Sequence, residues 1–272
     1  MNRILMKCSP LLLLSIWIII SGHTPHHEPS DKKLIADYVF IPSGSEGDSI
    51  IPEFYISAIE ITNLQYKEFI KELTDSGATE KLKIATVKGE QWSQLYVPCG
   101  PYLGYYFEHP AYDDYPVVNI SKRAAELYCD WLTEKYNRLA KKKARFALPT
   151  EMQWEYAAKG GNPKAIYPWP GNSVTITKKG KTYGMRLCNY QADSTRISDL
   201  TAPSRSFSPN TYGIYNMSGN AAEMIADQDY TKGGSYGSPA AKVLIAAHEE
   251  ADIIHGSPYI GFRPVMIYET GH

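Results

Sequence analysis

Helical periodicity is confined to three segments of this 272-residue chain, and all three end before residue 162. A Ser or Thr stands at the N-cap position before each segment, at Thr62, Ser121 and Thr150. After Gly161, short apolar runs alternate with Gly, Pro, Asn and Asp, which indicates strands joined by turns. Three helices followed by a long strand-and-turn region exclude a helical bundle and predict an α+β fold.

The predicted helices have local start signals and one apolar face each. The first and the third begin with capping boxes, Thr62 with Gln65 and Thr150 with Gln153. The second is expected over 122–140, where apolar residues recur every three or four positions. Before the first helix, YVFI from Tyr38 and the segment Glu53–Ile61 are expected to be strands.

Residues 78–115 carry many aromatic side chains and several Pro and Gly residues, with no sustained periodicity. Such a segment is typical of an insertion that packs over the core, and a recognition surface is the alternative. No repeat and no change of composition divides the rest of the chain. One domain over 38–272 is therefore expected.

The charge balance limits the partners. The chain has 28 Lys and Arg against 29 Asp and Glu, for a net charge of -1. It therefore lacks the basic field that would bind nucleic acid or an anionic membrane surface.

The N-terminus has the pattern of an export signal. Arg3 and Lys7 precede the apolar run 11–20, which is followed by small residues. This order predicts a signal peptide over 1–22, followed by a flexible linker over 23–37. We expect a periplasmic or cell-surface protein, with an uncleaved signal that keeps it at the membrane as the alternative.

Three cysteines remain after the predicted signal: Cys99, Cys129 and Cys188. An odd number leaves at least one thiol without an intramolecular partner, and no Cys-x-x-Cys zinc pattern occurs. Cys129 is expected to pack as a small apolar side chain. A disulfide between Cys99 and Cys188 is left open.

Several phrases, in order, resemble the sulfatase-modifying-factor family, whose founding activity is the formylglycine-generating enzyme. They are FIPSG (40–44), FYISAIEITNLQYKEFI (54–70), PVVNISKRAAELYCDWL (116–132), RFALPTEMQWEYAAKGG (145–161), YPW (167–169), TAPSRSFSPNTYGIYNMSGNAAEM (201–224), KGGSY (232–236) and GFRPV (261–265). The resemblance implies a fold related to C-type lectins, with a twisted antiparallel sheet, flanking helices and much irregular structure.

The family's catalytic cysteines are not matched. The generating enzyme binds copper through two cysteines after GGSY, and these places fall on Ser238 and Val243. Copper(I) prefers thiolates, a valine has no donor atom, and no Cys follows Cys188. We therefore expect no copper and no oxidase activity. Ser235, Tyr236, Ser238, Val243 and Arg263 would form a vestigial groove, with Arg263 as a buried structural cation or, alternatively, a substrate contact.

The resemblance also implies structural calcium. By position, Asn216 and Glu223 would offer side-chain oxygens, and Gly219 and Ala221 backbone carbonyls, which are ligands that calcium accepts. A turn held by hydrogen bonds from Asn216 and Glu223 is the alternative. A second site would use Asn189, Tyr190 and Asp199, in a segment shorter than the family's.

Taken together, these features predict a non-catalytic, calcium-stabilised binding or scaffold protein of the bacterial cell envelope. The resemblance implies protein partners, such as those of an outer-membrane, secretion or motility assembly. A lectin-like glycan binder, or an enzyme with altered chemistry in the same groove, is the alternative. The scattered His248 and His255, and the adjacent Glu249 and Glu250, are expected to face solvent.

Overall fold

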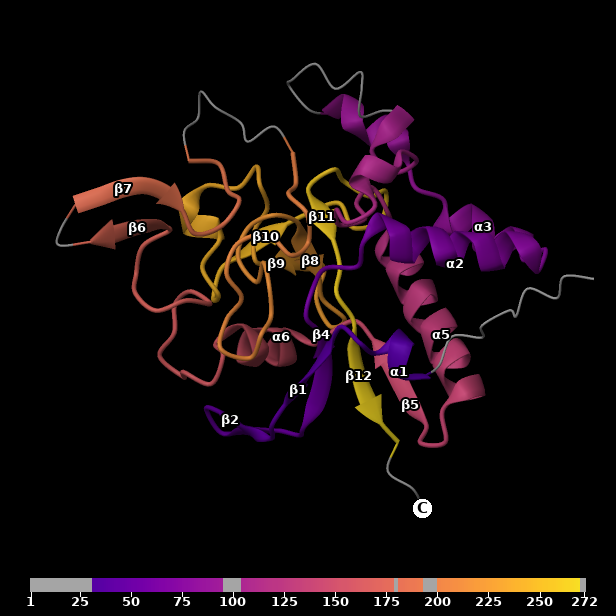
Figure 1. The fold of residues 1–272 in the computed structure, drawn as a ribbon, viewed down its shortest axis with the longest axis horizontal. Helices are drawn as coiled ribbons and strands as arrows, with labels where there is room; N and C mark the ends of the chain where they lie inside the picture. The colour runs from indigo at the N-terminus through magenta and orange to yellow at the C-terminus, as the bar shows by residue number, and fades with distance from the viewer. Residues whose placement is uncertain (1–30, 95–103, 179–180, 193–199, 270–272) are drawn as a thin grey trace, which may run out of the picture.

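Two four-stranded sheets occupy the centre of Figure 1, with helices on one side and a long hairpin on the other. The computed structural model describes residues 31–94, 104–178, 181–192 and 200–269. The mixture of short sheets and helices is the predicted α+β class. Among the described residues, no helix is long and apolar enough to cross a membrane.

The first sheet is antiparallel and places the C-terminal strand between two earlier ones. Its order is β1 (Tyr38–Ile41), β4 (Phe54–Ser57), β12 (Val265–Tyr268) and β5 (Ala144–Ala147). Val265 lies opposite Ile56 on β4 and opposite Ala147 on β5. The predicted strand over 53–61 is shorter than expected, because the chain turns after Ser57 toward the next helix.

The second sheet consists of very short strands from the C-terminal half. Its order is β10 (His248–Glu250), β9 (Tyr230–Lys232), β8 (Ala222–Met224) and β11 (Ile260–Gly261). The pairing of β11 with β8 is parallel, whereas the first sheet is antiparallel, as the resemblance implies. Two hairpins complete the strands: β2 (Gly44–Glu46) with β3 (Ser49–Ile51), and β6 (Thr175–Lys178) with β7 (Lys181–Arg186).

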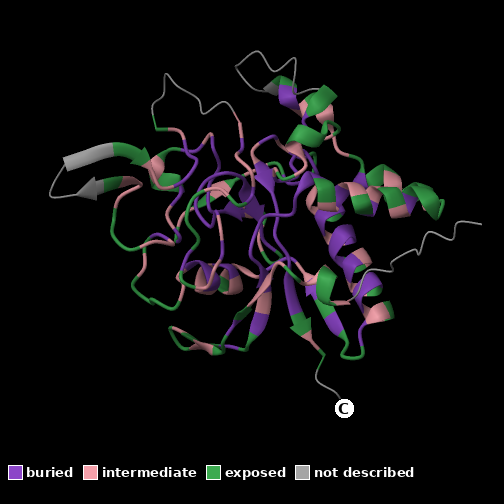
Figure 2. Cartoon of the chain, in the orientation of Figure 1, coloured by how far each residue is buried: buried purple, intermediate pink, exposed green. Residues whose placement is uncertain are grey.

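Both faces of the first sheet are covered. Phe146 and Met266 point into one apolar cluster together with residues of α2 (Asn63–Asp75) and α5 (Lys122–Leu139). Val265 and Ile56 point into another cluster with Trp154 of α6 (Glu151–Ala158). Neighbouring strand residues alternate between the clusters, as the strand period requires. Figure 2 shows buried residues gathered in these central strands and loops.

The three predicted helices are present, with the predicted caps. Both capping boxes are formed, by Thr62 with Gln65 and by Thr150 with Gln153. Ser121 accepts a hydrogen bond from the backbone N–H of Ala124 at the start of α5. The cap signals lie within three residues of each helix start, which is why the sequence predicts them well.

The aromatic insertion packs over the core, as expected, but it is not wholly irregular. It contains α3 (Thr79–Ala85) and the 3-10 helices η1 (Gly89–Gln94) and η2 (Pro110–Tyr112), which the sequence did not predict. Trp92 and Tyr106 are almost fully buried, with ring centroids 4.8 Å apart. A third 3-10 helix, η3 (Ala240–Lys242), follows the second sheet's β9.

Residues 31–37, expected to belong to the flexible linker, are part of the fold. They contain α1 (Asp31–Leu34), and Leu34 and Ile35 pack against the first apolar cluster. The Asp37 carbonyl also accepts a hydrogen bond from the Ala58 N–H. The apolar contacts of Leu34 and Ile35 anchor the segment ahead of β1. The predicted signal peptide lies outside the described residues.

Candidate functional site

A pocket of about 430 Å³ lies beside the second sheet. It is lined by the loop after β9, by β10 and by the segment that leads into β11. Ser235 and Ser238 come from the loop, and Glu249 comes from β10. Two of the residues expected in the groove, Ser235 and Ser238, thus line one pocket.

A chain of hydrogen bonds connects the two serines to Glu249. The Ser238 hydroxyl donates to the Glu249 carboxylate, and the hydroxyl oxygens of Ser235 and Ser238 are 3.1 Å apart. A hydroxyl has one hydrogen, so Ser235 must donate to Ser238 if Ser238 donates to the carboxylate. The Gly237 N–H donates to Ser235 at 3.2 Å. This arrangement orients Glu249 toward the serines, so it does not simply face solvent as expected.

The lining is acidic and carries one aromatic ring. Glu249, Glu250 and Asp252 contribute carboxylates, and none of the described lining residues is Lys or Arg. Hydrogen bonds from the backbone and the side chain of His255 lower the pKa of Asp252. Tyr259 adds an aromatic surface. The pocket is thus suited to a ligand that carries positive charge.

The expected groove residues separate into two groups. Ser235 and Ser238 line the pocket, whereas Tyr236, Val243 and Arg263 do not. The Tyr236 ring is buried, with its centroid 5.0 Å from that of Tyr259. Val243 is fully buried in an apolar cluster. Val243, the residue expected at the place of the second copper cysteine, therefore belongs to the core.

Neither of the two described thiols lines the pocket. Cys129 and Cys188 are buried and free. Burial raises the pKa of Cys129, as it raises that of Cys188 to about 12, so both favour the protonated form. Cys129 packs as predicted. Cys99 lies outside the described residues.

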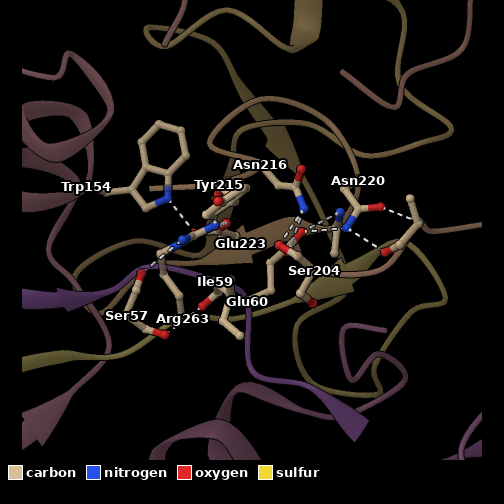
Figure 3. A network of polar contacts seen from close by, with 12 residues as sticks. Ser57, Ile59, Glu60, Trp154, Ser204, Tyr215, Asn216, Asn220, Glu223 and Arg263 are labelled. Carbon is tan, nitrogen blue, oxygen red and sulfur yellow. Dashed lines mark hydrogen bonds and ion pairs between the residues drawn. The ribbon is translucent and has the colours of Figure 1, made fainter. Parts of the chain in front are cut away.

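Arg263 forms a buried ion pair with Glu223 (Figure 3). Its guanidinium donates to both carboxylate oxygens, at 2.7–2.9 Å, and to the carbonyls of Ser57 and Tyr215. The indole N–H of Trp154 donates to the same carboxylate at 2.7 Å. Arg263 is thus a buried cation with hydrogen bonds to a carboxylate and to two carbonyls.

The hydrogen bonds of Glu223 and Asn216 show whether these two predicted calcium ligands are available to an ion. The Glu223 carboxylate is already neutralised by Arg263, and a calcium ion would have to displace part of that pairing. Asn216 directs its amide nitrogen to Glu60 and to the Ser204 carbonyl. A calcium ion bound through Glu223 does not fit this arrangement.

Residues of the second predicted calcium site also make hydrogen bonds within the protein. The Asn189 amide donates to the Leu200 carbonyl, and the Tyr190 carbonyl accepts from Arg186. Asp199 lies outside the described residues. Among the residues that the structure does describe, no place gathers three or more His, Cys, Asp or Glu side chains for one metal ion.

Two glutamates of the central region were missed or misjudged by the sequence analysis. Glu60 is completely buried and accepts hydrogen bonds from the amides of Asn216 and Asn220. A signal was present, because a single acid stands between Ile59 and Ile61 in an apolar run. Glu249 had no such signal, since its partner Ser238 lies in another segment.

The sequence matches the model of the sulfatase-modifying factor enzyme 1-like domain over residues 28–267. Formylglycine-generating enzyme of Bos taurus is 30% identical over 202 residues, covering 65% of this chain and 49% of that protein. The enzyme of Thermomonospora curvata is 29% identical, with 70% and 65% covered. Inactive C-alpha-formylglycine-generating enzyme 2 of Bos taurus is 26% identical, with 69% and 65% covered. The chain thus spans about half to two thirds of these relatives.

Solved structures support the fold. PvdO from Pseudomonas aeruginosa has a TM-score of 0.61 and 21% identity, covering 87% of this chain and 96% of that one. CarF has a TM-score of 0.53 and 19% identity, with 84% and 97% covered. The two central sheets, the capped helices and the ordered sequence phrases thus occur together with a family match over most of the chain. The chain belongs to the formylglycine-generating-enzyme-like family of sulfatase-modifying factors.

Proposed function

We propose that this chain is a non-catalytic family member of the bacterial cell envelope, which uses the pocket beside β10 to bind a partner protein. The observation that carries the proposal is the side chain at the place of the first copper cysteine. The GGSY phrase leads us to expect Ser238 there, and the Ser238 hydroxyl donates to the Glu249 carboxylate. A family scaffold with a hydrogen-bonded hydroxyl at that place favours binding over oxidation.

The chemistry of copper supports this. Copper(I) prefers sulfur ligands, and the described sulfhydryl groups are buried and do not line the pocket. Val243 supplies no ligand atom and is fully buried in the core. The family also includes relatives named as inactive, so loss of the oxidase is compatible with retention of the domain.

The lining of the pocket supports a basic partner segment. Glu249, Glu250 and Asp252 give it negative charge, and Tyr259 gives it an aromatic wall that favours ammonium or guanidinium groups. Such a segment would gain electrostatic attraction at encounter and lose it as salt rises. The export signal predicted over 1–22 supports a partner in the envelope.

Two measurements test the function. The purified chain, supplied with copper and oxygen, is incubated with a cysteine-containing sulfatase peptide, and mass spectrometry should find no aldehyde product. In parallel, the chain is isolated from membranes with its native partners after cross-linking. Formation of the aldehyde would refute the non-catalytic role. Recovery of the chain without a reproducible protein partner would refute the binding role.

A glycan ligand is the second candidate. Carboxylates and hydroxyls beside the Tyr259 ring resemble the donors and the aromatic platform that bind sugars. A glycan array distinguishes the two, because a sugar should then bind with little dependence on salt. If the chain is instead an enzyme with a different reaction in the same pocket, a substrate should be turned over. Ser238→Ala should then abolish the turnover without abolishing binding.

A further inference from the structure

Charge is separated along this chain, although its net charge is only -1. Residues 156–192 contain no Asp or Glu but six basic residues: Lys159, Lys164, Lys178, Lys179, Lys181 and Arg186. Residues 243–262 contain no Lys or Arg but carry Glu249, Glu250 and Asp252, the three carboxylates of the pocket. A protein with one basic and one acidic region attracts a second copy of itself when both regions are accessible.

The β6–β7 hairpin belongs to the basic region and projects from the body of the protein (Figure 1). Among the described strands, β6 and β7 pair only with each other. Ile176 is 36% exposed and Met185 is 63% exposed, beside the paired residues Thr175 and Arg186. A ribbon of two strands is only marginally stable by itself, and its exposed apolar side chains gain from a partner surface.

The register of the hairpin favours an anionic partner. Lys178 lies directly opposite Lys181 in the strand pairing. Like charges at opposite positions destabilise a pair of strands. The basic region itself supplies no carboxylate, since residues 156–192 contain no Asp or Glu. Carboxylates from another copy would replace this repulsion with attraction.

The acidic pocket lies beside the segment that follows the hairpin. The Gln191 N–H donates to the Ser238 carbonyl at 2.9 Å, and Gln191 forms a parallel bridge with Pro239. No described residue of the hairpin lines the pocket, so the described part of the hairpin leaves the pocket of its own copy open. Its volume of about 430 Å³ falls within the range of about 300–1,000 Å³ of ligand pockets, which gives room for lysine side chains.

We propose that the β6–β7 hairpin of one copy docks into the acidic pocket of a second copy. The inference rests on the proposed function, because it names a second copy of this chain as a protein that the pocket binds. The ammonium groups of Lys178 and Lys181 meet the carboxylates of Glu249 and Glu250. The segment after the hairpin contacts the rim of the pocket, so two copies related by a two-fold axis exchange hairpins and close as a dimer.

Protection of the hairpin edges is the rival role for the lysines. Lysines on free strand edges keep many proteins from pairing edge to edge. That role predicts a monomer whose state of association does not depend on the charge of the pocket. The dimer, in contrast, depends on the charges of the hairpin and of the pocket together.

Sedimentation velocity of the full chain tests the proposal. The wild type should be a dimer at about 50 mM salt, and the Kd of the dimer should rise tenfold or more at about 500 mM salt. Association through the apolar run 11–20 would persist, because salt does not weaken apolar contacts. A dimer that is equally stable at both salt concentrations would overturn the proposal.

A charge exchange tests the pairing of hairpin and pocket. Lys178→Glu with Lys181→Glu should raise the Kd about 100-fold, because both contacts of the dimer then join like charges. Glu250→Lys with Asp252→Lys should do the same from the side of the pocket. An equal mixture of the two double variants should form a heterodimer, since each contact again joins opposite charges. Glu250→Gln, a milder change at an exposed residue, should raise the Kd about tenfold.

Lys164→Glu is the matched control, because Lys164 is exposed and belongs to the basic region but lies outside the hairpin. It should leave the Kd unchanged. A monomeric wild type, or a mixture of the folded double variants that does not associate, would overturn the proposal. If a monomeric wild type still binds an oligolysine peptide in the pocket, the binding role proposed above stands without the dimer. If it binds neither that peptide nor a native partner, both proposals fail.

Discussion

Replacing Arg263 with Met tests the role of the buried ion pair. Arg263 is fully buried, and Glu223 is 1% exposed at its side chain. After the substitution, the Glu223 carboxylate keeps the indole of Trp154 as its donor but loses its counter-charge. The carbonyls of Ser57 and Tyr215 lose donors as well.

The expected cost follows from these contacts. Breaking a buried ion pair by removing one partner costs about 3–5 kcal/mol, because a charge remains without compensation. Each buried carbonyl that loses its donor adds about 1 kcal/mol. The sum, about 5–7 kcal/mol, approaches the whole stability of about 5–15 kcal/mol that is typical of a domain. Arg263→Met should therefore be mostly unfolded or only marginally stable.

A double-mutant cycle separates the ion pair from the other contacts. Glu223→Gln combined with Arg263→Met removes both charges and should recover about 3 kcal/mol relative to the sum of the single changes. Urea denaturation followed by tryptophan fluorescence measures each free energy of unfolding, and Arg263→Lys keeps a folded reference. A loss below about 2 kcal/mol for Arg263→Met, or strict additivity in the cycle, would refute the assigned role.

Further predictions concern the caps, a thiol and the pocket. Thr150→Ala should lower the free energy of unfolding by about 1 kcal/mol in chemical denaturation, because it removes the side chain that accepts from the third helical N–H; an unchanged midpoint would contradict the cap. Cys188 should resist alkylation at pH 8 until the chain is unfolded, as mass spectrometry would reveal, because burial raises its thiol pKa to about 12. Glu249→Gln should weaken the binding of a basic peptide, measured by calorimetry, and should leave Tm unchanged. Asp48→Asn, at an exposed residue outside the pocket, is the control. Hydrogen bonds from His255 lower the pKa of Asp252. The stability that they contribute is therefore present above the ordinary aspartate pKa and is lost as pH falls through the lowered value. A pKa at or above the ordinary value, measured by NMR titration of the Asp252 carboxyl carbon, would disprove this.

Local signals explain how much of the fold could be predicted. The caps at Thr62 and Thr150 depend on residues three positions away, and both are formed. The strands of the second sheet are only two or three residues long, and partners distant in sequence define them. No periodicity can develop over such a length. This is why the parallel pairing of β11 was not foreseen.

Only two of the pocket's lining residues, Ser235 and Ser238, could be named from the sequence. Ser235 and Ser238 lie in the expected groove, since the phrase that contains them is a continuous segment. The calcium motif identified Asn216 and Glu223 by residue type alone. It could not reveal that Glu223 faces Arg263, because that contact depends on how distant loops pack. The same limitation concealed the burial of Glu60.

The position of β12 in the first sheet has a consequence for how the chain matures. Val265 pairs with two strands that are synthesised long before it. Strands β4 and β5 therefore have no common neighbour until β12 is available. Such distant pairing slows folding, since a large loop must close first. A nascent chain would therefore lack the strand that joins β4 to β5 until residues 265–268 have been made. A chain that stops before Val265 should leave two strand edges exposed and aggregate.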